Sequence, residues 1–142
     1  MAVTRKASAH WEGSLIEGKG QVSFDSSNLG RYDVTWAARS AEPNGKTSPE
    51  ELIAAAHSTC FSMALSHALA QNGTPADTVD THAEVDFKPG TGITGIRLTV
   101  RGAVPGLTED QFVDFARQAK EGCPVSQALK AVPIELETEF VA

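Results

Sequence analysis

The stretch that decides the fold is TSPEELIAAAHSTCFSMALSHAL, residues 47–69. Ser48 and Glu51 have the spacing of a capping box, in which each side chain bonds the other residue's backbone amide, and Pro49 suits the first helical position. The residues that follow are apolar or small on nearly every side, which predicts a helix buried all round and ending near Gly73. One domain of this size would struggle to cover such a helix, so we expect a subunit interface beside it.

Short β-favouring runs, several of them alternating, flank this helix on both sides. We expect strands at residues 8–11, 21–24, 31–36, 81–87, 95–102 and 134–141. Two further helices are predicted, one opened by Thr108 with Gln111 as capping-box partner, and a short one that starts at Pro124. Because strands and helices do not alternate as regular βαβ units, the order predicts one α+β domain, residues 1–142, with antiparallel sheet.

Composition excludes several classes of function. The chain has 142 residues, is 41% hydrophobic and carries a formal net charge of -6. An acidic surface repels phosphate backbones and anionic lipids, so neither nucleic acid nor a membrane is an expected partner. No apolar run approaches the roughly 20 residues that span a bilayer, and the first residues lack the apolar stretch of a signal peptide. The expected location is the cytosol.

The two cysteines, Cys60 and Cys123, have two possible roles. In a reducing cytosol a stable disulfide is not expected, so they are either inert core thiols or a redox couple. Cys123 lies at the expected N-cap of the short helix, where the helix dipole favours a thiolate. Cys60 lies in an apolar helix and would need a nearby cation, for which Arg39 is the nearest candidate in the sequence, although Arg39 also fits an ordinary solvated charge.

Other candidate residues have simpler explanations. Glu50 lies in the first turn of the long helix, where an acidic residue complements the helix dipole. His57 and Cys60 share one helical face, but the remaining histidines lack the paired spacing of a zinc site, so we expect no metal. The glycine-rich segment at residues 88–95 lacks the strand–glycine–helix setting of a phosphate loop, so we expect no nucleotide cofactor.

Two segments resemble a known family. Residues 47–66, TSPEELIAAAHSTCFSMALS, resemble the segment around the reactive cysteine of the OsmC family, and residues 122–131, GCPVSQALKA, resemble its second cysteine motif. Residues 9–13, AHWEG, with Lys19 and Gly20, are similar to the family's N-terminus. The resemblance runs nearly from end to end. It favours the OsmC branch over the sister branch of organic hydroperoxide resistance proteins.

The resemblance implies a fold and an activity. The family forms intertwined α+β homodimers, with antiparallel sheets wrapped around two central helices, and reduces organic hydroperoxides, and hydrogen peroxide less well, in oxidative and osmotic stress. By this resemblance Cys60 attacks the peroxide and Cys123 resolves the resulting sulfenic acid as a disulfide. Arg39 and Glu50 take the positions of the family's site arginine and glutamate. The sister branch suggests a dithiol reductant of the lipoyl type, and no cofactor is implied.

The residue types suit this chemistry. A guanidinium stabilises both the attacking thiolate and the departing oxygen, and a carboxylate orients it through a bidentate pair. Glu50 and Cys60 are 60 − 50 = 10 residues apart, about 15 Å along a helix. Either the helix breaks between them, or Arg39 and Glu50 reach the cysteines of the other subunit, which is the alternative we favour. Phe61, Met63 and Leu65 are expected to line an apolar substrate pocket.

Two alternatives remain. The first is a redox sensor or stress-response binding protein, in which the disulfide switches an interaction and no turnover follows. The second is a structural protein with two inert core cysteines. Turnover with a dithiol reductant separates an enzyme from a sensor, and alkylation of the folded protein separates both from the structural alternative.

Overall fold

The computed structural model describes residues 1–142 as two compact units, Met1–Leu52 and Ile53–Ala142. The first unit contains a small sheet and a short helix, and the second contains the larger sheet and most of the helical residues. The mixed α+β class expected from the sequence is confirmed. That residues 1–142 form a single domain stays a prediction.

In the first unit, three short strands form an antiparallel sheet in the order β1-β2-β3, Ser8–Glu12, Lys19–Ser23 and Arg31–Val34. A five-residue helix, α1, follows at Trp36–Ser40. Its N-cap is Thr35, whose hydroxyl accepts a hydrogen bond of 3.1 Å from the backbone N–H of Ala38. The prediction that the third strand continues to Trp36 is wrong, because this cap starts a helix there.

The long helix α2 spans Pro49–Gln71 without a break. At its start the hydroxyl of Ser48 accepts a 3.2 Å hydrogen bond from the backbone N–H of Glu51. The carboxylate of Glu51 accepts a bond of 2.6 Å from the Thr47 hydroxyl. The predicted capping box is therefore only half formed, since Glu51 bonds the preceding threonine.

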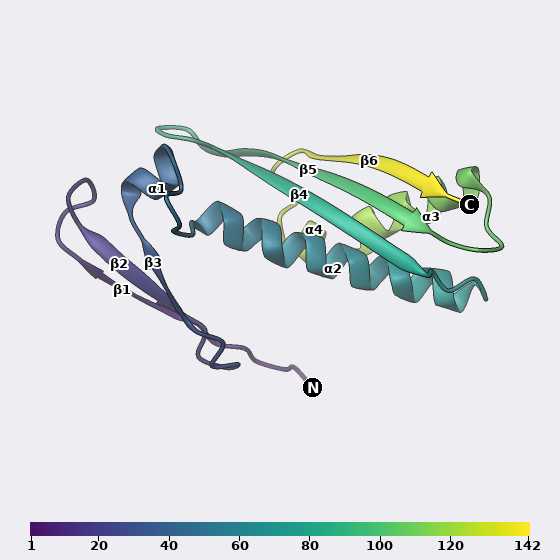
Figure 1. Ribbon diagram of the computed structural model, residues 1–142, viewed down its shortest axis with the longest axis horizontal. Helices are drawn as coiled ribbons and strands as arrows, with labels where there is room; N and C mark the ends of the chain where they lie inside the picture. The colour runs from purple at the N-terminus through teal and green to yellow at the C-terminus, as the bar shows by residue number, and fades with distance from the viewer. The chain divides into compact units, whose positions relative to one another are not determined.

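The sheet of the second unit has the order β4-β5-β6 (Figure 1). Strands β4, Thr78–Lys88, and β5, Gly92–Ala103, pair antiparallel, whereas β5 pairs parallel with β6, Ile134–Val141. The predicted purely antiparallel sheet is wrong at this pair. Helices α3, Glu109–Gly122, and α4, Pro124–Ala128, form the connection between β5 and β6, and this crossover returns the chain to the end of the sheet where β5 began.

One face of this sheet builds the core. Helices α2 and α3 lie on it, as Figure 1 shows, and their buried residues meet those of β5. The helix α2 contributes Phe61, Leu65 and Leu69, which recur every four residues and so share one side of the helix. The capping box of Thr108 and Gln111 that opens α3 is present as predicted.

The second unit leaves the opposite side of α2 exposed. Ala55, Ala56 and Thr59 are exposed, and Met63 is 68% exposed. This exposure agrees with the expectation that one chain does not cover the helix, and its burial on all sides stays a prediction. A large apolar side chain such as Met63, surrounded by small residues, leaves an apolar face that water covers in the monomer.

By length and composition alone, α2 is apolar enough to cross a membrane. Mean hydropathy over the helix, which α2 satisfies, is a looser criterion than an uninterrupted run of apolar residues, which the sequence lacks. Core helices of proteins outside membranes meet it as well, and the residues Phe61, Leu65 and Leu69 of α2 pack in the core of the second unit. The feature is weak evidence for a membrane span.

Candidate functional site

The two cysteines, far apart in the sequence, meet in the second unit. Cys60 lies in the middle of α2 and is half-buried, whereas Cys123 is fully buried between α3 and α4, as the C-cap of one and the N-cap of the other. Their side chains approach to 2.9 Å with both thiols free. Two sulfur atoms this close need only a small movement to form a disulfide of about 2.05 Å.

The surroundings of Cys60 act on its thiol in opposite directions. Burial raises the pKa of Cys60 above its usual value, and the hydrogen bond with Cys123 raises it further. The backbone N–H of Val125, which donates to Cys60, lowers the pKa. Because proline has no N–H, Pro124 makes the Val125 amide the first free donor of α4. The first free N–H of α4 thus donates to Cys60, whereas the side chain of Cys123, the N-cap residue, makes no capping hydrogen bond.

Arg39 and Glu50 form an ion pair in the first unit. The Nε of Arg39 donates to Oε1 of Glu50 at 3.0 Å, and its Nη2 donates to Oε2 at 2.9 Å, so the pair is bidentate. The Glu50 side chain is 8% exposed and that of Arg39 is 31% exposed. Arg39 lies in the last turn of α1 and Glu50 in the first turn of α2. A nearly buried carboxylate fixes the orientation of a guanidinium that still meets solvent.

The four predicted residues are therefore found as two pairs, Cys60 with Cys123 and Arg39 with Glu50. The helix that carries both Glu50 and Cys60 is unbroken, so these residues lie about 15 Å apart along its axis. This excludes the alternative in which a break in α2 brings them together.

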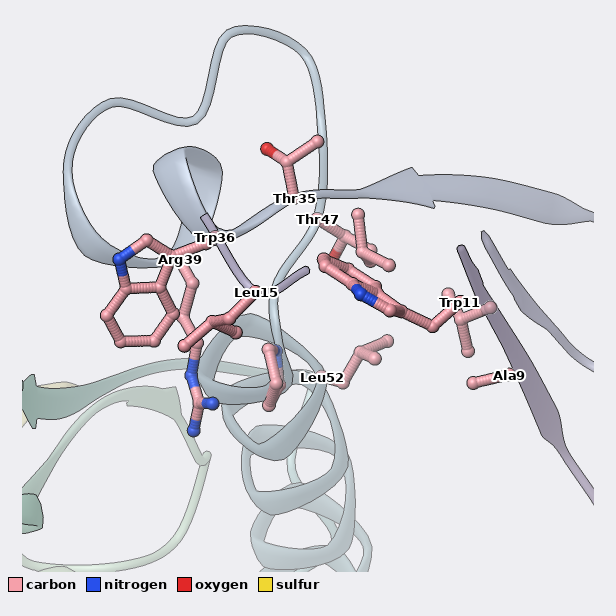
Figure 2. Close-up of a pocket in the computed structure, with 11 residues that line it drawn as sticks. Ala9, Trp11, Leu15, Thr35, Trp36, Arg39, Thr47 and Leu52 are labelled. Carbon is pink, nitrogen blue, oxygen red and sulfur yellow. The ribbon is translucent and has the colours of Figure 1, made fainter. Parts of the chain in front are cut away.

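A cavity of about 510 Å³ opens in the first unit beside Arg39 (Figure 2). Its lining is mostly apolar and includes two tryptophans, with Trp11 coming from β1 and Trp36 from α1. Leu15 and Leu52 extend the apolar wall, as Figure 2 shows. The volume lies within the range of small-molecule pockets, and a single cation in an apolar wall suits a ligand with one polar end.

The pocket residues expected from the sequence are placed differently. Phe61 and Leu65 are fully buried in the core of the second unit, and neither lines this cavity. Met63 is on the exposed face of α2. None of the three residues lines the cavity beside Arg39, although the sequence predicts them in an apolar pocket. Two of them, Phe61 and Leu65, pack in the core instead.

A buried histidine lies one turn before Cys60. His57 is fully buried, and its Nε2 lies 2.7 Å from the hydroxyl of Ser126 on α4. Burial lowers the pKa of His57 below its ordinary value of 6.5. From the sequence, His57 was a candidate metal ligand, and its bond to Ser126 was not expected. A signal for this bond was present in the sequence, because His57 and Ser126 each lie three residues from one of the two cysteines.

No group of three or more His, Cys, Asp or Glu side chains is placed to hold a metal ion.

Comparisons with known proteins agree on one family. The family model described as OsmC-like protein matches residues 42–137. A protein of Escherichia coli strain K12 named Peroxiredoxin OsmC is 44% identical over 134 residues, which cover 92% of this chain and 93% of that protein. A Staphylococcus epidermidis protein named Organic hydroperoxide resistance protein-like 2 is 27% identical over 64% of this chain and 66% of its own length.

The fold also matches solved structures. A crystal structure from Legionella pneumophila, described as an organic hydroperoxide resistance protein OsmC, aligns with a TM-score of 0.71. The alignment covers 100% of this chain and 99% of that chain at 24% sequence identity. At this identity the likeness shows the fold alone.

Proposed function

The chain belongs to the OsmC family, and on that premise we propose that it is a thiol peroxidase that reduces organic hydroperoxides, and hydrogen peroxide less well, in oxidative and osmotic stress. The names of its relatives, a peroxiredoxin and organic hydroperoxide resistance proteins, support a role in peroxide defence. The single observation that carries the proposal is the approach of Cys60 and Cys123 to 2.9 Å, with only Cys60 reaching solvent.

In the proposed cycle Cys60 is the nucleophile. Its thiolate attacks the distal oxygen of the hydroperoxide, the O–O bond breaks, and the departing alkoxide takes a proton and leaves as the alcohol. Cys60 is then a sulfenic acid. The Cys123 sulfur attacks the Cys60 sulfur, water leaves, and a disulfide forms. A dithiol reductant, of the lipoyl type in our proposal, returns both thiols.

Arg39 is proposed to stabilise the thiolate and the departing oxygen, with Glu50 holding its guanidinium. Since α2 is unbroken between Glu50 and Cys60, we propose that the pair serves the cysteines of a second subunit. The uncovered face of α2, with Ala56 and Met63, supports this homodimer with composite sites because an apolar helix face favours a protein partner.

The cavity beside Arg39 is proposed to hold the organic part of the substrate. Its apolar wall with Trp11 and Trp36 suits an alkyl or aryl group, while the guanidinium at Arg39 suits the peroxide end. We propose a cytosolic location. The proposed cycle needs no metal or organic cofactor, because the cysteines carry the electrons themselves.

The test is a thiol count by mass spectrometry after one equivalent of cumene hydroperoxide. Wild type is expected to gain one Cys60–Cys123 disulfide, Cys123→Ser to stop at a Cys60 sulfenic acid, and Cys60→Ser to remain unchanged. If neither cysteine reacts, the thiols are core packing and the proposal fails. Repeated turnover with dihydrolipoamide supports an enzyme, whereas one oxidation without turnover indicates a sensor.

A further inference from the structure

A buried hydrogen bond joins α2 to α4 next to the cysteine pair. The residues His57 and Ser126 are 0% and 4% exposed, and their polar atoms Nε2 and Oγ lie 2.7 Å apart. His57 precedes Cys60 by one turn on α2, and Ser126 follows Cys123 by one turn on α4. The bond therefore links the same two elements that carry the two sulfur atoms.

The histidine ring bonds only this serine. Its other nitrogen, Nδ1, is the one buried side-chain nitrogen or oxygen in the chain without a hydrogen-bond partner. A second proton on the ring would place a charge and an unpaired N–H donor inside the protein, so His57 stays neutral. Burial lowers the pKa of His57, which agrees with a neutral ring. The hydrogen bonding of this buried ring is thus directed wholly at Ser126.

Helix α4 depends on such contacts for its position. It has five residues, and a helix that short is not stable without contacts to the rest of the protein. Two polar interactions between α2 and the segment formed by α4 and its N-cap end on the Cys60 sulfur, one from the Cys123 thiol and one from the Val125 amide. Both change when that sulfur gains an oxygen or enters a disulfide. The bond between His57 and Ser126 is the polar tie that does not depend on the oxidation state of Cys60.

We propose that His57 and Ser126 are a positioning pair that holds Cys123 against Cys60 while the Cys60 sulfenic acid is resolved. The kinetic part of this inference rests on the proposed function. The Cys123 sulfur attacks the Cys60 sulfur and water leaves, in competition with a second hydroperoxide, which would oxidise the sulfenic acid to sulfinic acid and leave as alcohol. The outcome depends on the effective concentration of Cys123 at Cys60, which the pair keeps high.

The kinetic test compares Ser126→Ala with wild type, by quenched-flow mass spectrometry after one equivalent of cumene hydroperoxide. We expect the disulfide to form about tenfold more slowly, as expected for loss of one buried hydrogen bond. Formation of the Cys60 sulfenic acid should slow less, because only the Val125 amide of α4 acts on that step. With excess hydroperoxide, sulfinic acid on Cys60 should accumulate. The matched control is Ser62→Ala, which removes a 2.6 Å bond from α2 to Thr81 of β4 and should resolve like wild type.

Variants at His57 separate the hydrogen bond from packing. His57→Leu should resolve as slowly as Ser126→Ala, and the double variant no more slowly than either, because both remove the same bond. His57→Gln keeps an amide that can bond Ser126 and should restore much of the rate. Disulfide formation in Ser126→Ala as fast as in Ser62→Ala would overturn the inference, as would a His57→Gln variant no faster than His57→Leu.

A measurement without peroxide distinguishes failure of this inference from failure of the proposed function. The Cys60–Cys123 disulfide is equilibrated with glutathione, and the equilibrium constant for its formation should fall about tenfold in Ser126→Ala but not in Ser62→Ala. If wild type does not react with hydroperoxides but the equilibrium constant falls in Ser126→Ala, the peroxidase proposal fails and the positioning role stands. If wild type turns over and the shift is absent, the positioning role is wrong.

Discussion

At the residue scale, Cys60 is where the local chemistry is most finely balanced. Its own chain raises the pKa of the thiol through burial and through Cys123, and only the Val125 amide opposes them. A thiol with a raised pKa is a poor nucleophile at neutral pH, because the thiolate is the reactive form. A reactive Cys60 therefore needs a cation, and Arg39 of a second subunit is the one we propose.

The first prediction concerns the pH dependence of Cys60 alkylation. The initial rate with iodoacetamide rises with pH through the pKa of the thiol, so Arg39→Ala should shift the profile of Cys60 to higher pH than in wild type. Arg101→Ala, which removes an exposed arginine paired with Glu139, is the control and should leave the profile unchanged. Coincident profiles for wild type and Arg39→Ala would show that Arg39 does not reach Cys60.

The second prediction concerns stability in mild acid. Unfolded chains protonate His57 near its ordinary pKa of 6.5, whereas burial lowers the pKa of the folded ring, so below pH 6.5 the unfolded state binds more protons. The stability that His57 contributes is thus present above pH 6.5 and is lost as pH falls towards the lowered value. Urea unfolding at pH 7.5 and 5.5 should show a smaller loss in His57→Gln than in wild type. His67→Gln, at an exposed position of the same helix, should lose as much stability as wild type.

At the element scale, the contact between β5 and α3 depends on a missing side chain. A Cβ at Gly102 would overlap the ring of Phe112, which is fully buried and cannot swing away. Close packing of strand and helix at this point therefore requires glycine. Gly95 lies in the same strand, and a Cβ there would make only an ordinary contact with the Pro133 carbonyl.

The third prediction follows from this contact. Gly102→Ala should reduce the free energy of unfolding by about 1–3 kcal/mol, as expected for overpacking, and Gly95→Ala should change it little. Adding Phe112→Leu to Gly102→Ala should recover part of the loss because the smaller side chain leaves room. Urea denaturation measures all four proteins, and equal stability of the two alanine variants would contradict the argument.

Most elements were predictable because their signals are local. Alternation identified β6, where Ile134 and Leu136 are half-buried and the glutamate that follows each of them is exposed. Thr108 with Gln111 identified the start of α3. Helix α1 was missed because five residues are too few to show a helical period, and its apolar start resembles a strand. The parallel pairing of β5 with β6 was missed because strand direction depends on the path of α3 and α4, which no local pattern encodes.

The candidate site was predictable only in part. Cys60 and Cys123 stand out as the two cysteines of the chain, and Arg39 was the nearest candidate cation in the sequence. The family resemblance added Glu50 and gave Arg39 its proposed role. The bond from His57 to Ser126 was not predictable, since a histidine in an apolar helix does not reveal which distant hydroxyl it meets. Phe61 and Leu65 do not line the cavity beside Arg39 for a related reason: they have the right chemical character, but burial decides whether a side chain packs or lines a cavity.

At the scale of the whole molecule, the uncovered face of α2 and the separation of Glu50 from Cys60 lead to one consequence. On the proposed mechanism, a chain that carries both halves of the site on one unbroken helix would need a second copy of itself to join them. The dimer would then be required for activity and not only for stability. The proposed substrate cavity beside Arg39 would serve the neighbouring subunit's cysteines.

The fourth prediction tests this arrangement by mixing inactive subunits. Arg39→Ala and Cys60→Ser should each abolish activity alone. After unfolding and refolding at equal amounts, half of the dimers contain one subunit of each kind, and each of those has one intact composite site, so about a quarter of wild-type activity should return. Peroxidase turnover measures it, and mixing Arg39→Ala with Glu50→Ala is the control that should stay inactive. No recovery would place Arg39 and Cys60 in the same subunit's site.

The burial of Cys123 has one more consequence for the proposed cycle. Once the two sulfur atoms are joined, an incoming reductant can touch only the one that belongs to Cys60, because Cys123 has no exposed surface. Thiol–disulfide exchange requires a direct approach to the sulfur attacked. The oxidised protein would therefore always be reduced through the same mixed disulfide, in which the reductant is bonded to Cys60. Cys123 would be the leaving thiolate in every cycle, so the order of the two exchange steps is fixed.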